Sequence, residues 1–147
     1  MNAPARPEPA LVTRLVEELG ATRLDDASFN AFAVLPAETV LFFTEDPQRF
    51  KEVLDLAVIV PEIRSAAARP FRIGVLPPPL ANAKASTYGV RRWPALVFLR
   101  DGAWLGNIEG LHEWTDFVAL ADELLKGEAR PLPPKVIPLA AAAAACG

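Results

Sequence analysis

Apolar residues along this chain follow two kinds of pattern, one with the spacing of strands and one with the spacing of helices. Strand patterns, rich in β-branched and aromatic residues, occur at residues 21–25, 39–44, 71–76, 95–99 and 103–109. Apolar residues three and four positions apart predict helices at residues 9–19, 28–35, 47–57, 62–68, 80–88 and 115–126. Strands are therefore expected to alternate with helices over most of the chain.

The ends of some predicted helices depend on local chemistry. Ser28 is expected to cap the second helix through its hydroxyl. Glu45 and Asp46 precede the helix predicted at 47–57, where carboxylates stabilise the positive N-terminal end. Pro61 follows that helix closely, and the sequence leaves open whether residues 58–61 kink it or break it.

The order of these elements indicates the class of fold. Alternation of strands and helices in the first half predicts parallel pairing with right-handed crossovers. Asp101 and Gly102 between the last two strands predict a two-residue hairpin, and hence an antiparallel end. An α/β fold, with a four- to five-stranded mixed sheet and helices on both faces, satisfies both requirements.

The 147 residues of the chain suit one domain, and its ends differ in composition from its middle. Residues 1–9 hold three prolines, and residues 128–147 hold four prolines and a run of six alanines. We therefore expect flexible tails at 1–9 and 128–147 on either side of a folded domain at 10–127.

Charge and hydrophobicity exclude some classes of function. The net charge of −3 argues against nucleic-acid binding, because neutralising phosphates requires clustered basic residues. The apolar runs are shorter than the roughly 20 residues that span a bilayer, so no membrane insertion is expected. The hydrophobic content of 52% indicates a thick two-sided core or, less simply, apolar surface kept for a partner.

Cysteine usage narrows the chemistry further. Cys146 is the only cysteine, so the chain has no internal disulfide, no Cys-x-x-Cys redox pair and no cysteine metal cluster. This usage and the absence of a recognisable signal peptide predict a cytoplasmic protein without a metal or cofactor. Neither a catalytic triad nor a glycine-rich phosphate loop is visible, so we expect no enzymatic activity.

The most specific pattern leads into the strand at 95–99. Trp93-Pro94 stands directly before this strand, at a position where a sheet tolerates proline because no N–H is needed. Together with Tyr-Gly-Val at residues 88–90 and the Asp-Gly turn, it resembles the corresponding segment of thioredoxins, and the likeness covers about residues 21–126. The resemblance implies a thioredoxin-like fold with a cis Trp93–Pro94 bond.

The likeness fails at the place of the thioredoxin cysteines. Residues 45–48 read Glu-Asp-Pro-Gln there, and thiol–disulfide exchange requires a thiolate at that position. Among redox-inactive relatives, the chain resembles the HyaE, HupG and HoxO family of hydrogenase expression/formation proteins. That likeness rests on Glu-Asp-Pro at 45–47, Val-Pro-Glu at 60–62 and the segment 92–102.

This family resemblance implies a function. The protein is expected to be a non-catalytic chaperone for an uptake [NiFe] hydrogenase small subunit, binding the precursor that carries a twin-arginine signal peptide before export. A second maturation factor is a possible further partner. The alternative is a redox-inactive structural adaptor within a protein assembly.

Five residues form the hypothetical partner-binding site. The backbone before Pro94 could pair with an extended peptide, and Trp93 could supply an apolar wall or simply pack inward. Glu45 and Asp46 could bind a basic peptide through charge-assisted hydrogen bonds, or only stabilise a helix terminus. Arg92, with its neighbour Arg91, could contact an acidic partner surface or be solvated.

Two further residues have weaker functional readings. His112 lacks a cysteine or second histidine nearby in sequence, so a surface or capping role is expected rather than metal binding. A thiol enzyme would have to use Cys146 as its nucleophile, and this residue lies after the run of six alanines near the C-terminus. An enzyme that uses Glu45 and Asp46 for acid–base chemistry is a third, disfavoured alternative.

Overall fold

Five strands form one sheet in the order β1-β3-β2-β4-β5. Their bounds are β1 Thr22–Arg23, β2 Glu38–Phe43, β3 Arg72–Leu76, β4 Ala95–Arg100 and β5 Ala103–Glu109. The computed structural model describes residues 7–134. β1, β3 and β2 pair in parallel, whereas β4 is antiparallel to β2 and to β5. The predicted mixed sheet is confirmed, with five strands.

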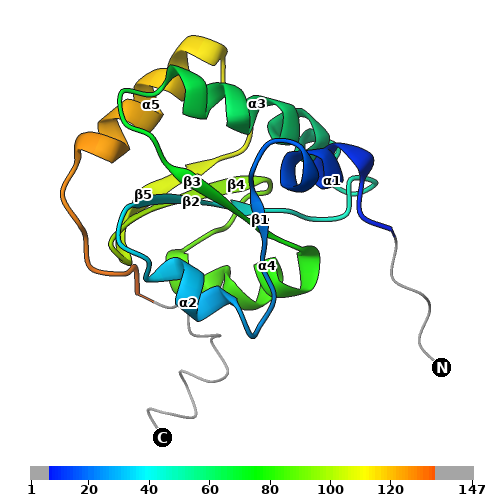
Figure 1. Ribbon diagram of the computed structural model, residues 1–147, viewed down its shortest axis with the longest axis horizontal. Coiled ribbons are helices and arrows are strands. Elements are labelled where there is room, and N and C mark those ends of the chain that lie inside the picture. The colour runs from blue at the N-terminus through cyan, green and yellow to red at the C-terminus, as the bar shows by residue number, and fades with distance from the viewer. Residues whose placement is uncertain (1–6, 135–147) are drawn as a thin grey trace, which may run out of the picture.

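Helices cover both faces of this sheet, as predicted (Figure 1). One face carries α1 (Ala10–Glu17), α3 (Glu52–Ala66) and α5 (Trp114–Lys126), and the other carries α2 (Phe29–Ala33) and α4 (Pro78–Lys84). A short 3₁₀ helix, η1 (Ser86–Tyr88), follows α4 and ends at Gly89, whose φ of 68° is left-handed. The helix predicted at 80–88 is thus two shorter helices.

The two faces of the sheet bury two separate apolar clusters. Val40 and Phe42 of β2 point into the cluster under α1, α3 and α5. Leu41 and Phe43 of the same strand point into the cluster under α2 and α4. All four side chains have 0% exposure, because successive side chains of a strand point to opposite faces. A thick two-sided core accounts for much of the hydrophobic content.

Helix α3 differs from the prediction at both ends. It begins at Glu52 rather than at residue 47, because residues 46–50 form a turn instead. In this turn the Asp46 carbonyl accepts hydrogen bonds from the N–H groups of Arg49 and Phe50. It then continues through Pro61 to Ala66 as one helix, so the predicted separate helix at 62–68 is wrong. Pro61 costs the helix one backbone hydrogen bond, but Val60 and Ile63 on either side of it are fully buried in the core. Burial keeps the helix continuous.

The chemistry at Ser28 also differs from the prediction. Its hydroxyl does not cap the N-terminus of α2. Instead it accepts a hydrogen bond from the Asp25 N–H at 3.0 Å. In return, Asp25 Oδ1 accepts a hydrogen bond from the Ser28 N–H at 2.8 Å, and this bond is the main cause of a lowered Asp25 pKa. The reciprocal pair closes the loop between β1 and α2.

The hairpin between β4 and β5 has the predicted two-residue turn. Asp101 and Gly102 both have positive φ, 52° and 85°, as the hairpin turn that matches the strand twist requires. Asp101 also exchanges two hydrogen bonds with Ala37, accepting one from its N–H at 2.9 Å and donating one to its carbonyl at 3.1 Å. This turn therefore also secures the start of β2.

The chain after α5 runs back past the edge strand β5. The Arg130 N–H donates a hydrogen bond to the Trp104 carbonyl at 2.7 Å. Most of the two predicted tails, at 1–6 and 135–147, lies outside the described residues, as does Cys146. Across the described part of the chain, none of the helices combines the length and apolar character needed to cross a membrane.

Candidate peptide-binding site

Backbone groups of the loop before β4 form hydrogen bonds with residues at the end of β5. The Trp93–Pro94 bond is cis, which confirms the expectation from the thioredoxin likeness. The N–H groups of Arg91 and Arg92 both donate to Glu109 Oε1, at 2.5 and 2.8 Å. The Pro94 carbonyl in turn accepts a hydrogen bond from the Gly110 N–H at 2.8 Å. These bonds hold the loop in one conformation.

Trp93 packs inward and is also partly exposed, so the proposed contact with a peptide stays a prediction. Its ring centroid lies 6.1 Å from that of Phe43, and it packs against the cluster under α2 and α4. The side chain is nevertheless only half-buried. One part of the indole therefore belongs to the core, and the remainder is available at the surface.

The acidic turn, which contains Glu45 and Asp46, lies close to the cis-proline loop, which contains Trp93 and Pro94. Both lie at the edge of the sheet formed by the end of β2 and the start of β4. Phe43, the last residue of β2, pairs with Ala95, the first residue of β4. Because these strands are antiparallel, the chain leaving β2 at Thr44 and the chain entering β4 at Pro94 meet at one edge. The strand register thus brings two of the predicted site segments together.

Asp46 organises the turn between β2 and α3. Its Oδ1 accepts a hydrogen bond from the Gln48 N–H at 3.0 Å, and its carbonyl accepts bonds from Arg49 and Phe50 at 3.0 and 2.9 Å. The predicted stabilisation of a helix N-terminus at residue 47 is therefore wrong, because α3 begins only at Glu52. Asp46 stabilises a turn instead.

Glu45 is directed toward a different element. Its side chain is 8% exposed, its Oε2 accepts a hydrogen bond from Asn82 Nδ2 of α4 at 2.7 Å, and its Oε1 accepts one from the Asp46 N–H at 2.9 Å. No lysine, arginine or histidine among residues 7–134 forms an ion pair with this carboxylate. Among residues 7–134, the hydrogen bonds to this buried carboxylate thus come from the amide groups of Asn82 and Asp46.

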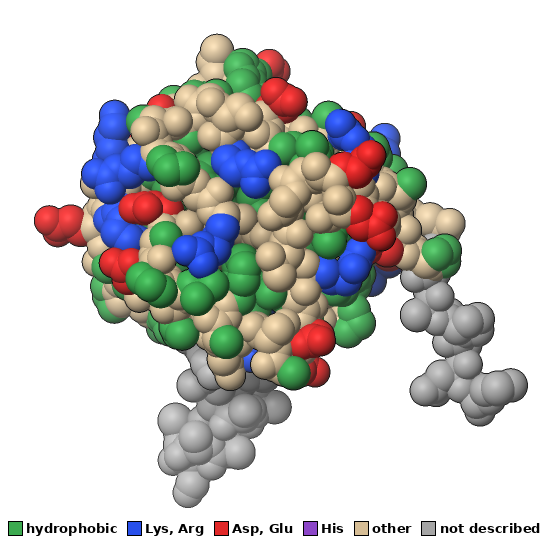
Figure 2. Space-filling view, viewed as in Figure 1, with side chains coloured by type: hydrophobic (Ala, Val, Ile, Leu, Met, Phe, Trp, Pro, Cys, Tyr) green, Lys and Arg blue, Asp and Glu red, His purple; other side chains and the backbone are tan. Residues whose placement is uncertain are grey.

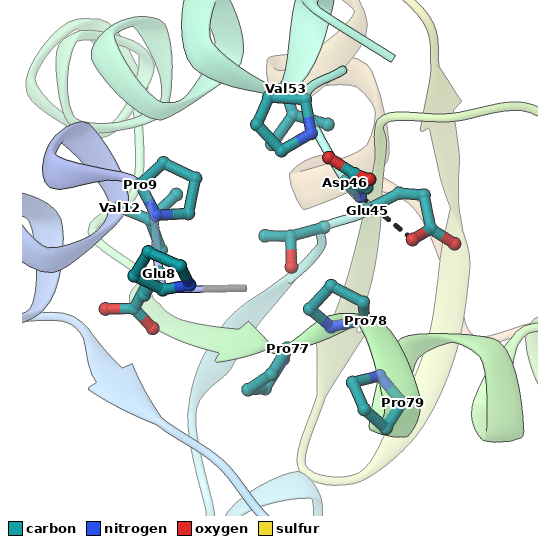
Figure 3. Close-up of a pocket in the computed structure, with 12 residues that line it drawn as sticks. Glu8, Pro9, Val12, Glu45, Asp46, Val53, Pro77, Pro78 and Pro79 are labelled. Carbon is teal, nitrogen blue, oxygen red and sulfur yellow. Dashed lines mark hydrogen bonds between the residues drawn. The ribbon is translucent and has the colours of Figure 1, made fainter. Parts of the chain in front are cut away.

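A pocket of 480 Å³ opens beside this turn. Six prolines supply much of its lining, Pro7, Pro9, Pro47, Pro77, Pro78 and Pro79, together with Val12, Thr44, Val53 and the acidic residues Glu8, Glu45 and Asp46. In Figure 3, Glu8 and Pro9 lie across the opening from Glu45 and Asp46, and the Glu8 and Glu45 carboxylates extend away from it. The wall of the pocket is therefore mainly apolar, and the carboxylates of Glu8 and Glu45 are turned away from it.

The N-terminal wall of this pocket is held by an ion pair with β1. Glu8 accepts hydrogen bonds from Arg23 Nε at 2.7 Å and Nη2 at 2.5 Å, and a third from Thr13 Oγ1 at 2.8 Å. The bond from the Arg23 guanidinium is the main reason that the pKa of Glu8 is lowered, against the opposing effect of burial. Residues 7–9, placed by the sequence in a tail, thereby contact the folded domain.

The sequence did not indicate this pocket. The sequence predicts a tail at residues 7–9 and indicates no role for the three consecutive prolines at 77–79. One signal was available, because parallel strands β2 and β3 end at the same edge and ligands commonly bind at that edge of α/β sheets. The cis-proline residues Trp93 and Pro94 do not line the pocket.

The remaining predicted residues lie apart from the pocket. Arg92 is exposed, and its guanidinium lies over Gly110. His112 is exposed, stacks edge-on against Phe117 with ring centroids 5.2 Å apart, and has Nε2 3.0 Å from the Glu109 carbonyl. Within residues 7–134, no group of three or more histidine, cysteine or acidic side chains could hold a metal ion.

Figure 2 shows basic and acidic side chains interspersed over the face drawn.

Comparison with known proteins gives a consistent set of similarities. Residues 11–117 match the family model described as "Hydrogenase-1 expression protein HyaE". The chain is 37% identical over 141 residues to the hydrogenase expression/formation protein HoxO of Cupriavidus necator, covering 92% of this chain and 86% of that one. It is 34% identical over 116 residues to HupG of Rhodobacter capsulatus, covering 78% and 84%.

A solved structure agrees with the sequence comparisons. It is a crystal structure described as a hydrogenase expression/formation protein hupG of Rhodopseudomonas palustris. The two chains superpose with a TM-score of 0.50 at 27% identity, over 71% of this chain and 95% of that one.

Proposed function

The chain belongs to the HyaE family of hydrogenase expression proteins, and on this premise we propose that it is a non-catalytic accessory protein in the maturation of a hydrogenase. More specifically, its client is the small-subunit precursor of an uptake [NiFe] hydrogenase, and it binds this precursor, with its twin-arginine signal peptide, in the cytoplasm before export. The relatives' names, which are those of expression/formation proteins, support the accessory role.

One observation carries the finer proposal. The cis-proline loop and the acidic turn meet at one edge of the sheet, where Phe43 pairs with Ala95, and residues 44–47 read Thr-Glu-Asp-Pro without a cysteine. A thioredoxin-like protein uses this edge to hold an extended chain against a thiolate. Without the thiolate, holding the chain is the function that this edge retains.

The chemistry at the edge favours a basic segment. Glu45 is buried without a cation among the described residues, and Asp46 lies next to it. Two arginines in succession would be attracted to these carboxylates, and we propose that Glu45 turns from Asn82 toward them on binding, so that charge-assisted hydrogen bonds form. The half-exposed ring of Trp93 supplies apolar contact area on the adjacent loop.

The test is capture of the small-subunit precursor by the tagged full-length protein. Glu45→Lys with Asp46→Lys is expected to weaken capture about tenfold or more, because each charge-assisted bond contributes about 1.5–3 kcal/mol. Glu17→Lys with Glu18→Lys, an equal charge change on exposed residues at the C-terminal end of α1, is the control and is expected to leave capture unchanged.

Three results would count against parts of this proposal. Failure of the unaltered protein to capture any precursor contradicts the client assignment. Unchanged capture by the Glu45/Asp46 double variant contradicts the role of the acidic turn. Persistence of the protein in the mature, exported enzyme at fixed stoichiometry favours a structural adaptor over a chaperone.

A further inference from the structure

We propose that a second cleft, beside the loop that leads to Trp93 and Pro94, binds the side-chain carboxylate of an acidic residue on a partner protein. The cleft has a volume of about 400 Å³, and none of its lining residues lines the pocket beside the acidic turn. It is lined by Asn82, Ala85, Ser86, Gly89, Val90, Arg91, Pro133 and Pro134. This inference goes beyond the client binding proposed above and does not depend on it.

The chain after α5 supplies one wall of this cleft. The Arg130 N–H donates to the Trp104 carbonyl of β5 at 2.7 Å, and four residues on, Pro134 lines the cleft. Pro133 packs closely on Gly89, since a Cβ added to Gly89 would lie 2.9 Å from Pro133 Cγ. In Figure 1 this segment, drawn in orange, runs from α5 toward the face that carries α2 and α4. A segment that the sequence assigns to a tail thus closes one side of the cleft.

Arg91 gives the cleft its positive charge. It is exposed, and it is the only titratable residue among those that line the cleft. Its backbone N–H donates to Glu109 Oε1, but among residues 7–134 its guanidinium forms no ion pair. By contrast, the guanidinium of Arg23 is paired with Glu8. The Arg91 guanidinium therefore has its donors available for a ligand.

The backbone around the cleft decides which anion fits. The N–H groups of residues 89–91 already donate to other groups of the chain, and Pro133 and Pro134 have no N–H. A phosphate would therefore lack the cradle of backbone donors typical of phosphate sites. A carboxylate needs only one guanidinium, which can hold both of its oxygens. The carboxylates of Glu109 and Glu45, bonded to the Arg91 N–H and to Asn82, oppose a dianion more than a monoanion.

The remaining lining groups suit the rest of an acidic residue. Asn82 uses its Nδ2 for bonds to Glu45 and to the Pro78 carbonyl, so its Oδ1 can accept a peptide N–H. Ser86 is exposed, and its hydroxyl can donate or accept. Val90 and the two prolines offer apolar surface to the aliphatic part of the side chain. These groups favour a residue within a peptide over a free small carboxylate.

The experiment titrates the full-length ¹⁵N-labelled protein with three probes. The first is the peptide Ser-Gly-Ala-Glu-Ala-Gly-Ser with acetylated and amidated ends, the second has Gln in place of Glu, and the third is sodium acetate. The Glu peptide is expected to shift the amide signals of Ser86, Gly89 and Val90, and to leave that of Val58 on α3 unchanged. The Gln peptide and acetate are expected to bind about tenfold more weakly, because each lacks part of the contact.

A charge variant tests the role of Arg91. Arg91→Met is expected to weaken binding of the Glu peptide about tenfold, because the charge-assisted hydrogen bonds are lost. Arg14→Met is the matched control, since Arg14 is exposed on α1, on the opposite face of the sheet, and removes the same charge. Binding of the Glu peptide to the control is expected to equal that to the wild type.

A glycine variant tests the wall formed by the C-terminal segment. Gly89→Ala displaces Pro133 and is expected to weaken binding of the Glu peptide about threefold or more, because the cleft loses one side. Gly20→Ala is the matched control. Gly20 has a similar φ, 81° against 68°, but a Cβ there would meet no atom within 4 Å. Both variants carry the same kind of backbone strain, so only the contact with Pro133 differs.

The outcomes decide each part of the inference. Equal affinity for the Glu and Gln peptides overturns the carboxylate, and equal affinity for acetate overturns the partner protein as its source. Equal weakening by Arg91→Met and Arg14→Met means that net charge, not the cleft, attracts the peptide. The wild-type titration does not depend on whether a variant folds. No measurement uses the hydrogenase precursor, so failure to capture the precursor contradicts the proposed function and leaves the cleft unaffected.

Discussion

Asn82 Nδ2 lies 2.7 Å from Glu45 Oε2 and so joins helix α4 to the buried carboxylate that follows β2. The same Asn82 amide also donates to the Pro78 carbonyl at 2.7 Å, within the first turn of α4. One side chain therefore secures the orientation of Glu45 and the start of a helix that walls the pocket. Of the two hydrogen bonds to Glu45 described above, its removal would leave the one from the Asp46 N–H.

Asn82→Ala is expected to lower the free energy of unfolding by about 1–3 kcal/mol, because a buried charged acceptor loses its partner. Urea unfolding at pH 7 measures the change. Asn30→Ala, at an exposed position of α2, is the control and should change stability by less than about 0.5 kcal/mol. Equal effects of the two substitutions would contradict a structural role for the Asn82–Glu45 bond.

Arg100 is expected to matter more for stability than Arg69, although both contact Glu38 Oε1. Arg100 Nε lies 3.0 Å from that oxygen, and the guanidinium also donates to the Gly127 carbonyl at 2.8 Å and to the Leu125 carbonyl. Arg69 is 51% exposed and lies 3.5 Å away. Arg100→Met should cost about 1–3 kcal/mol in urea unfolding, against less than about 0.5 for Arg69→Met.

Gly74→Ala is expected to destabilise β3 by overpacking. A Cβ at this position would lie 2.6 Å from Phe32 Cε1 and 2.9 Å from Leu24 Cδ1, so at least one of these side chains must shift. The expected loss is about 1–3 kcal/mol, measured as a lower thermal midpoint. Gly127→Ala, whose new Cβ would approach no described atom closer than 3.4 Å, serves as the comparison. A comparable loss in both variants would mean that crowding against Phe32 and Leu24 is not the cause.

The Glu8–Arg23 ion pair is expected to make a small, pH-dependent contribution to stability. The pKa of Glu8 is lower in the folded protein, so this stability is present above the ordinary glutamate pKa of about 4.3 and is lost as pH falls through the lowered value. With Arg23 41% exposed, a contribution of roughly 0.5 kcal/mol is expected. The unfolding midpoints of wild type and Glu8→Gln should differ at pH 7 and converge as the pH falls below the lowered pKa of Glu8. Glu123→Gln, exposed on α5, should show no such convergence.

Trp93→Ala is expected to weaken precursor capture about tenfold, if the exposed part of the ring contacts the client. Trp114, 46% exposed at the start of α5, provides a control of the same size. Thermal unfolding of both variants is measured beside capture. A Trp93→Ala protein that loses stability but captures the precursor normally would assign Trp93 to packing alone.

The fold could be predicted because its determinants are local and repeated. The patterns at 39–44, 71–76 and 95–99 have the composition of buried strands, and Asp101-Gly102 specifies one hairpin type. Helix α3 was harder. Pro61 reduces backbone bonding whether a helix kinks, breaks or continues, and only the burial of Val60 and Ile63 on both sides decides the outcome.

The candidate site was predicted only in part. Trp93, Pro94, Glu45 and Asp46 come from motifs that are contiguous in sequence, and β2–β4 register brings them to one edge. The pocket depends instead on residues 7–9, 44–47 and 77–79, whose proximity follows from packing between distant segments. Likewise, the bond between Glu45 and Asn82 spans 37 positions, and no local pattern indicates it.

The two outermost strands of the sheet, β1 and β5, affect how this protein behaves in a crowded cell. An unpaired edge strand is a template for edge-to-edge pairing with another chain, and so for aggregation. Here β1 is only two residues long, and the Trp104 carbonyl on the outer edge of β5 is already paired with Arg130. The β1 edge is therefore too short to offer a long unpaired row to a neighbouring molecule, and the β5 edge is paired at Trp104. If the protein holds an unexported precursor as we propose, the short β1 edge limits strand pairing with that precursor and so limits coaggregation.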